Sequence, residues 1–269
     1  MKSVLKLILI LSIPTFFFGC EEDEDKNFQT DLSLEANQLF GISTVWGESL
    51  YFGLLNFEDY SQISRAELPG CPNILIESTE KRVTLTFDPT DVCEQSGKVK
   101  RTGKLNLQYH LIGTKSSPWI LTYEGYTFQN DTITGTREFS VTGLNQVKET
   151  FIYLKKTSNK ELNTTFSGML NHNLTKFRNK VVGLSSSGSI SGTISTGRNF
   201  SIDISSPRQS LATCFSQNEI LPIAGKENWT IDRGQSRVVM HSINYETSGS
   251  CAVTAQVTLS DGRNLLVIP

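Results

Sequence analysis

Residues 82–88 read RVTLTFD, a stretch in which apolar side chains at every second position alternate with polar ones. The same period of two recurs in residues 105–111, LNLQYHL, and in residues 253–260, VTAQVTLS. Strict alternation is typical of antiparallel strands that bury one face and expose the other. The pair Asp261-Gly262 follows the last of these stretches and predicts a C-terminal hairpin. The sequence therefore predicts an all-β, mainly antiparallel fold, either sandwich-like or built as two elongated β lobes.

Residues 31–60 follow a different pattern, because their buried-type side chains recur at alternating steps of four and three, as on one side of an amphipathic helix. The stripe consists of Leu32, Ala36, Leu39, Ser43, Trp46, Leu50, Gly53 and Phe57. Each glycine inside a helix costs about 1 kcal/mol, and this segment holds Gly41, Gly47 and Gly53. We therefore expect one helix or two short ones, with the apolar face packed on the sheet.

The first nineteen residues are typical of a secretory signal, since Lys2 and Lys6 precede an apolar run that continues through Phe18. That run has roughly a dozen residues, fewer than the ~20 that span a bilayer as a helix. It ends in Phe18-Gly19-Cys20, which resembles the lipobox of bacterial lipoproteins, although Phe18 replaces the usual small residue. We expect a lipoprotein signal peptide at 1–19, cleavage before Cys20, and acyl chains on its thiol. The alternative is an ordinary signal peptide followed by a free or disulfide-bonded Cys20.

Residues 20–30 are expected to form a lipidated acidic tether, because residues 21–25 read EEDED. Repulsion between like charges favours an extended, solvated spacer. The acidic run also resembles the surface-export signal of Bacteroidota lipoproteins, and the two interpretations are compatible. Together with Cys20 they predict a protein attached to the outer membrane by lipid and facing the cell exterior.

Four cysteines remain once Cys20 is assigned to lipid, and four cysteines allow three pairings. Proximity in sequence favours Cys71 with Cys93 and Cys214 with Cys251. An oxidising compartment makes disulfides the expected state. A metal site is disfavoured because no pair has CxxC spacing and no histidine is close in sequence.

A set of scattered residues spans most of the chain beyond the signal: Cys71-Pro72, residues 83–88, Cys93, Gly97, residues 101–104 (RTGK), residues 135–137 (GTR), Cys214, Pro222, Cys251 and Asp261-Gly262. In this order they resemble a family of uncharacterised Bacteroidota surface lipoproteins. The resemblance implies an exported, all-β protein and implies no reaction. By this interpretation residues 61–269 are the β ectodomain, with an alternative division into lobes 61–157 and 158–269.

The histidines offer no catalytic motif. His110 follows the polar positions of its stretch and is expected to face solvent, and His172 is expected in a loop. His241 shares a face with Val239 and Ile243, which favours a hydrogen-bonded core histidine. No HExxH or GxSxG sequence is present. These observations favour a non-catalytic role and predict neither a cofactor nor a metal.

Two surface features remain as candidates. Asp131-Thr132-Ile133 resembles the site at which Bacteroidota attach O-glycans, which makes Thr132 a candidate for glycosylation. Trp119, Tyr123 and Tyr126 favour glycan binding if they lie exposed on one face.

The charge balance excludes one class of partner. The formal net charge is −2 and the pI about 6.0, so no basic excess points to nucleic acid. The expected partners are the membrane, through the lipid on Cys20, and a polysaccharide or an envelope or host protein. The function predicted is a binding or structural module; the alternatives are a surface hydrolase with an unrecognised site and an envelope-assembly or transporter-accessory subunit.

Overall fold

The computed structural model describes residues 22–91, 99–110, 117–158, 162–234 and 237–267, with side chains from residue 32 onward. The helices are α1 (Glu22–Glu48), α2 (Leu50–Leu54), α3 (Phe57–Tyr60) and α4 (Ala212–Ser216), with a 3-10 helix, η1, at Arg65–Glu67. The strands are β1 (Asn73–Glu77), β2 (Arg82–Phe87), β3 (Arg101–Gln108), β4 (Trp119–Phe128), β5 (Asp131–Thr134), β6 (Thr136–Gly143), β7 (Gln146–Thr157), β8 (Asn163–Phe177), β9 (Lys180–Thr193), β10 (Asn199–Leu211), β11 (Ala224–Asp232), β12 (Val238–Thr247), β13 (Val253–Thr258) and β14 (Asn264–Val267).

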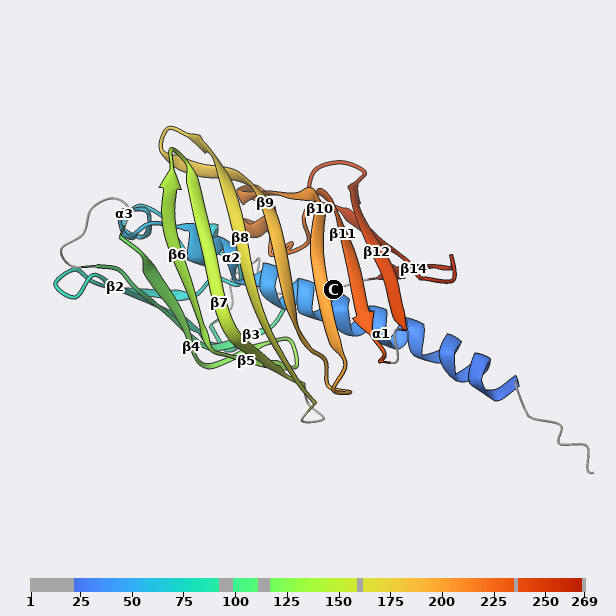
Figure 1. The fold of residues 1–269 in the computed structure, drawn as a ribbon. Coiled ribbons are helices and arrows are strands. Elements are labelled where there is room, and N and C mark those ends of the chain that lie inside the picture. The colour runs from blue at the N-terminus through green and yellow to red at the C-terminus, as the bar shows by residue number, and fades with distance from the viewer. Residues whose placement is uncertain (1–21, 92–98, 111–116, 159–161, 235–236, 268–269) are drawn as a thin grey trace, which may run out of the picture.

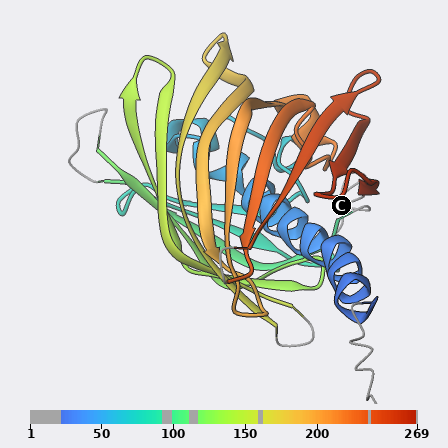
Figure 2. The ribbon, with the colours of Figure 1, turned by 45° about the vertical axis from the view of Figure 1, so that its right-hand side comes forward.

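All strands belong to one antiparallel sheet that curves around α1, as Figures 1 and 2 show. Strands that are consecutive along the chain pair with each other, except β5 and β6, which both lie between β4 and β7 and pair with those two strands. The predicted all-β, antiparallel fold with an N-terminal helical segment is confirmed. The strands form a single curved sheet rather than two facing sheets. β7 and β8, which lie on either side of the alternative lobe boundary at residues 157 and 158, pair along most of their length, so the sheet is continuous across that boundary.

The apolar side chains that alternate with polar ones in the sequence are the ones that face α1. In β2 every second side chain is buried, namely Val83, Leu85 and Phe87. The polar residues between them face outward. The predicted C-terminal hairpin is present as β13 and β14, which are paired and joined through a turn at Gly262, whose φ is +85°.

The helical stripe is buried along its whole length, from Leu32 to Phe57. The expectation that this face packs on the sheet is therefore confirmed. α1 begins at Glu22, so residues 22–25 of the acidic run lie in its first turns and not in an extended spacer. The helical segment is interrupted at Ser49, between α1 and α2.

Glycines let the helical segment approach the sheet closely. A Cβ placed on Gly53 would lie 2.3 Å from Cζ of Phe139, and one on Gly47 would lie 2.9 Å from Nη2 of Arg208. Gly41 has no atom closer than 3.7 Å. Two of the three glycines that argued against a helix are thus explained by close packing.

Candidate functional site

Four clusters of arginine and carboxylate side chains lie between the helical segment and the concave face of the sheet; we call them the arginine clusters. The first is at Glu35, which is 2 % exposed and pairs with Arg198 and Arg233. The second joins Ser43 of α1 to Arg208 and Glu227. Arg208 Nη1 lies 2.6 Å from both the Ser43 hydroxyl and Glu227 Oε1.

The third arginine cluster lies beneath Trp46. Arg137 Nε donates to Glu149 Oε1 at 2.6 Å, and Trp46 Nε1 donates to Glu149 Oε2 at 3.2 Å. The same guanidinium donates to the Ser49 hydroxyl at 2.7 Å. Burial alone would raise the pKa of Glu149, but the Arg137 charge and the contacts with His172 lower that pKa to about 2. Glu149 is therefore a buried carboxylate that stays charged because its partners surround it.

The fourth arginine cluster lies at the carboxyl end of α1, where Glu48 is the last residue of the helix. Arg101 Nε donates to Glu48 Oε2 at 3.1 Å, and the Tyr126 hydroxyl donates to the same oxygen at 2.8 Å. The Oε1 atom of Glu48 is buried without a hydrogen-bond partner among the described residues. Burial raises the pKa of Glu48, and the charge of Arg101 offsets this only in part. The cluster fixes the carboxyl end of α1 over β3 and β4.

Ser186, His172 and Glu149 on three adjacent strands have the connectivity of a catalytic triad. His172 Nδ1 lies 2.8 Å from Ser186 Oγ, and Nε2 lies 3.0 Å from Glu149 Oε2. All three are at most 1 % exposed, and the Trp46 ring stacks over His172 with centroids 6.3 Å apart. A serine nucleophile has to reach its substrate. In this closed arrangement the three groups are covered by Trp46 of α1, which hydrogen-bonds to Glu149 and stacks on His172, and they help to hold α1 on the sheet.

The expectation that His172 lies in a loop is wrong, because it is buried in β8. Its neighbours Leu170 and Leu174, two residues away on either side, share its face. That alternation was the available signal. His110 is exposed as expected. His241 is a buried core histidine as expected, and its Nδ1 accepts from the backbone N–H of Ser260 at 3.3 Å.

The aromatic side chains considered for glycan binding share one face, but that face is the concave one. Trp119 is 7 % exposed and Tyr126 is fully buried. Tyr123 is half-buried, and its hydroxyl hydrogen-bonds to that of Ser49. The condition for glycan binding at these residues, exposure on one face, is therefore not met, since the helical segment covers them.

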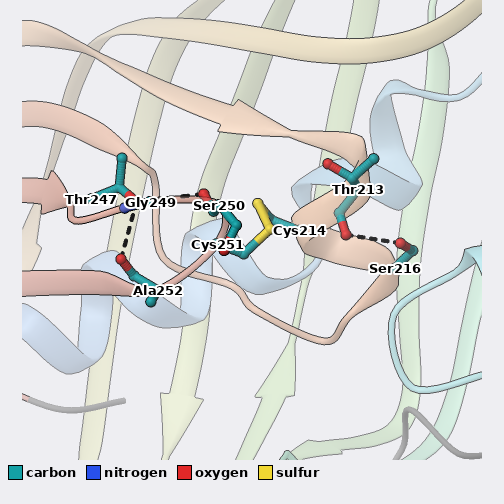
Figure 3. The surroundings of a disulfide bond; sticks show 8 residues. All are labelled: Thr213, Cys214, Ser216, Thr247, Gly249, Ser250, Cys251 and Ala252. Atoms are coloured by element: carbon teal, nitrogen blue, oxygen red, sulfur yellow. Dashed lines mark hydrogen bonds between the residues drawn. A yellow bond between two sulfur atoms is a disulfide. The ribbon is translucent and has the colours of Figure 1, made fainter.

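The Cys214–Cys251 bridge is confirmed and joins α4 to the turn between β12 and β13, as Figure 3 shows. Its Cα atoms are 5.2 Å apart. The other expected bridge includes Cys93, which lies outside the described residues, as does the lipidation candidate Cys20. Cys71 is buried.

Thr132, the glycosylation candidate, is exposed on β5. The neighbouring Asp131 carboxylate forms an ion pair with Lys156 at 2.9 Å. The side chain is thus accessible, and nothing in the contacts of β5 tests whether it is modified.

A cavity of about 580 Å³ opens beside α2 and α3, between these helices, α4 and the turn that joins β8 to β9. Ligand cavities in proteins commonly measure 300–1,000 Å³. Its apolar lining includes Leu55, Ile63 and Val181. Figure 1 shows α2 and α3 at the opposite end of α1 from its first residues.

Tyr51 of α2 is the buried polar side chain of this cavity. It is 4 % exposed, and its ring stacks on Phe215 with centroids 5.1 Å apart. Among the residues that the structure describes, none hydrogen-bonds to its hydroxyl. Burial, together with the charges of Glu67 and Asp59, raises the pKa of Tyr51 to about 12. The cavity therefore holds a neutral hydroxyl that is free to bond a ligand.

Two further findings limit the chemistry of the described residues. No group of three or more histidine, cysteine, aspartate or glutamate side chains in them could hold a metal ion. Within the same ranges, none of the helices combines the length and apolar character needed to cross a bilayer.

Comparison with protein-family models, with curated proteins and with solved structures found no match to this chain.

Proposed function

We propose that the chain is a lipid-anchored binding module of the outer membrane that faces the cell exterior and takes a small ligand into the cavity beside Tyr51. The observation that carries the binding role is the cavity of about 580 Å³, whose lining includes Tyr51, a side chain that is 4 % exposed and whose hydroxyl bonds to no described residue. A cavity of this size, lined by apolar side chains and a few polar groups, is typical of a site for a small ligand.

The anchor and the cavity suit each other in position. Cys20 precedes the start of α1 by two residues, and 27 residues of α-helix are about 40 Å long. α2 and α3 follow the far end of that helix. A lipid on Cys20 would therefore separate the cavity from the membrane surface by up to about 40 Å, measured along the axis of α1. At that distance the cavity is open to molecules from the medium.

Binding is tested on the full-length protein in detergent, with saturation-transfer NMR against a fragment set of neutral, cationic and anionic compounds. Thr213 is exposed and lines the cavity, so Thr213→Trp should fill the entrance and abolish binding. Val238→Trp, on the outer face of β12, is the matched control. Fragments that bind wild type and Thr213→Trp equally would refute the assignment of the cavity.

The cell-surface location is tested by protease treatment of whole cells. We expect the protein to be digested while periplasmic markers survive. Survival of the protein would place it on the inner side of the membrane. Glycosylation of Thr132 is tested separately by the intact mass of the natively expressed protein. If Thr132→Val lowers that mass by more than the difference between the two side chains, Thr132 carries a glycan.

A surface hydrolase is the second candidate function. One observation favours it, namely the arrangement of Ser186, His172 and Glu149. Its burial beneath Trp46 argues for a structural role. A fluorophosphonate probe, which labels activated serines, should leave Ser186 unmodified, and labelling of Ser186 would restore the hydrolase as the leading proposal.

A further inference from the structure

The cavity beside Tyr51 has two walls of opposite charge. The wall formed by α3 and η1 carries Asp59 and Glu67. The opposite wall, formed by the end of β8, the turn after it and the start of β9, carries Lys176, Arg178 and Lys180. Among the described residues the walls are joined by an ion pair in which Lys180 Nζ lies 3.4 Å from Glu67 Oε1. Beyond that pair, charges of both signs line the same space.

Several of these groups have bonding capacity left for a ligand. One carboxylate oxygen of Asp59 accepts from the Asn56 backbone N–H at 2.9 Å, and no described residue bonds to the other. The ammonium of Lys176 donates no hydrogen bond to another described residue. Burial raises the pKa of Asp59, and the Asn56 backbone bond and the nearby Lys176 charge offset this. Asp59 and Lys176 thus face the same space from opposite walls.

The Tyr51 side chain lines the same cavity as Asp59 and Glu67, so a hydroxyl oxygen accompanies the two carboxylates there. Carboxylate and hydroxyl oxygens together satisfy an ammonium group, which has three donors. Lysine and arginine side chains suit a carboxylate or phosphate. The apolar lining between the walls suits a hydrocarbon body.

We propose that the ligand of this cavity is a zwitterion with an apolar body, of the size of a short peptide, whose ammonium group binds at Asp59 and Tyr51 and whose anionic group binds at Lys176 and Arg178. This inference rests on the proposed binding function. It adds the chemical class of the ligand, and a neutral or singly charged ligand would leave one wall without a partner.

The test uses isothermal titration calorimetry on the full-length protein in detergent with three probes. Trileucine has both free termini, N-acetyl-trileucine lacks the ammonium, and trileucine amide lacks the carboxylate. Trileucine should bind, and blocking either end should weaken binding about tenfold or more, because each block removes a charge-assisted hydrogen bond. Equal binding of all three probes, abolished by Thr213→Trp, would overturn the zwitterion inference and leave the binding function intact.

Variants separate recognition of each end from a general loss of structure. Asp59→Asn should weaken trileucine about tenfold and leave N-acetyl-trileucine unchanged, because the acetyl group has already removed the ammonium. Lys176→Met should show the reverse selectivity, weakening trileucine and leaving trileucine amide unchanged. Lys226→Met, an exposed lysine of β11, is the control. Uniform weakening of all three probes by either variant contradicts the assignment of the two ends.

Absence of binding by any of the three probes at millimolar concentration would also overturn the inference. The proposed function is judged separately by the fragment set, which contains neutral and singly charged compounds. Fragments that bind in the cavity when trileucine does not would show a binding module with another ligand class.

Discussion

Replacing Arg137 by methionine should destabilise the protein more than any other single change at its ion pairs. The guanidinium and the Glu149 carboxylate are both fully buried, and their closest atoms are 2.6 Å apart. Arg137→Met leaves the Glu149 charge buried with only Trp46 and His172 to compensate it. Removing one partner of a buried pair costs about 3–5 kcal/mol. We therefore expect the free energy of unfolding to fall by about 4 kcal/mol.

The assay is urea denaturation followed by tryptophan fluorescence, since Trp46 contacts the cluster directly. Lys104→Met is the control, because Lys104 pairs with Glu124 at 3.0 Å while both side chains are exposed. Exposed pairs contribute about 0–1 kcal/mol, so the control should be nearly neutral. Both variants should unfold with the wild-type denaturant slope.

A second variant identifies the cause. Adding Glu149→Gln to Arg137→Met removes the unpaired charge, so the double variant should be more stable than Arg137→Met by about 1–2 kcal/mol. A loss below about 1 kcal/mol in Arg137→Met, or a double variant less stable than the single, would refute the view that a charged Glu149 depends on Arg137.

Three further predictions concern stability. The pKa of Glu149 is about 2 in the folded protein, compared with the ordinary glutamate value of 4.5, which applies to the unfolded chain. Its contribution of about 3 kcal/mol is therefore present above pH 4.5 and should be lost as the pH falls toward 2, and Glu149→Gln should flatten this loss in acid denaturation curves. Replacing Cys214 and Cys251 by serine should cost about 4 kcal/mol in the same urea assay, because the bridge closes a loop of 37 residues; a loss equal to that of a surface substitution contradicts this. Gly53→Ala should lower the melting temperature, because its Cβ would overlap an aromatic ring, whereas Gly41→Ala should raise stability by up to about 1 kcal/mol; equal effects would contradict the packing of the helical segment.

The sheet and the helical stripe could be predicted from the sequence because both depend on periodicity along a short stretch. Alternation in residues 82–88 and 253–260 defined the buried face of β2 and β13. Steps of four and three placed Leu32 and Trp46 on the buried side of α1. The start of α1 could not be placed, because the acidic run is equally compatible with a spacer and with a helix end.

The arginine clusters and the cavity could not be predicted, because their members are distant in sequence. Glu35 meets Arg233, and Ser43 meets Glu227, only after the sheet has curved around α1. A single charged residue in an alternating strand is indistinguishable from a solvated one until its partner is known. The cavity likewise combines Tyr51 with the turn between β8 and β9, and no local pattern connects these segments.

The proposed location at the membrane surface depends on the anchor at Cys20. Mass spectrometry of the amino-terminal peptide from the natively expressed protein tests it most directly. We predict a chain that begins at Cys20 and carries a thioether-linked diacylglycerol, with or without a further amide-linked acyl chain. A chain that retains residues 1–19, or a Cys20 free of lipid, would contradict the assignment to the membrane surface.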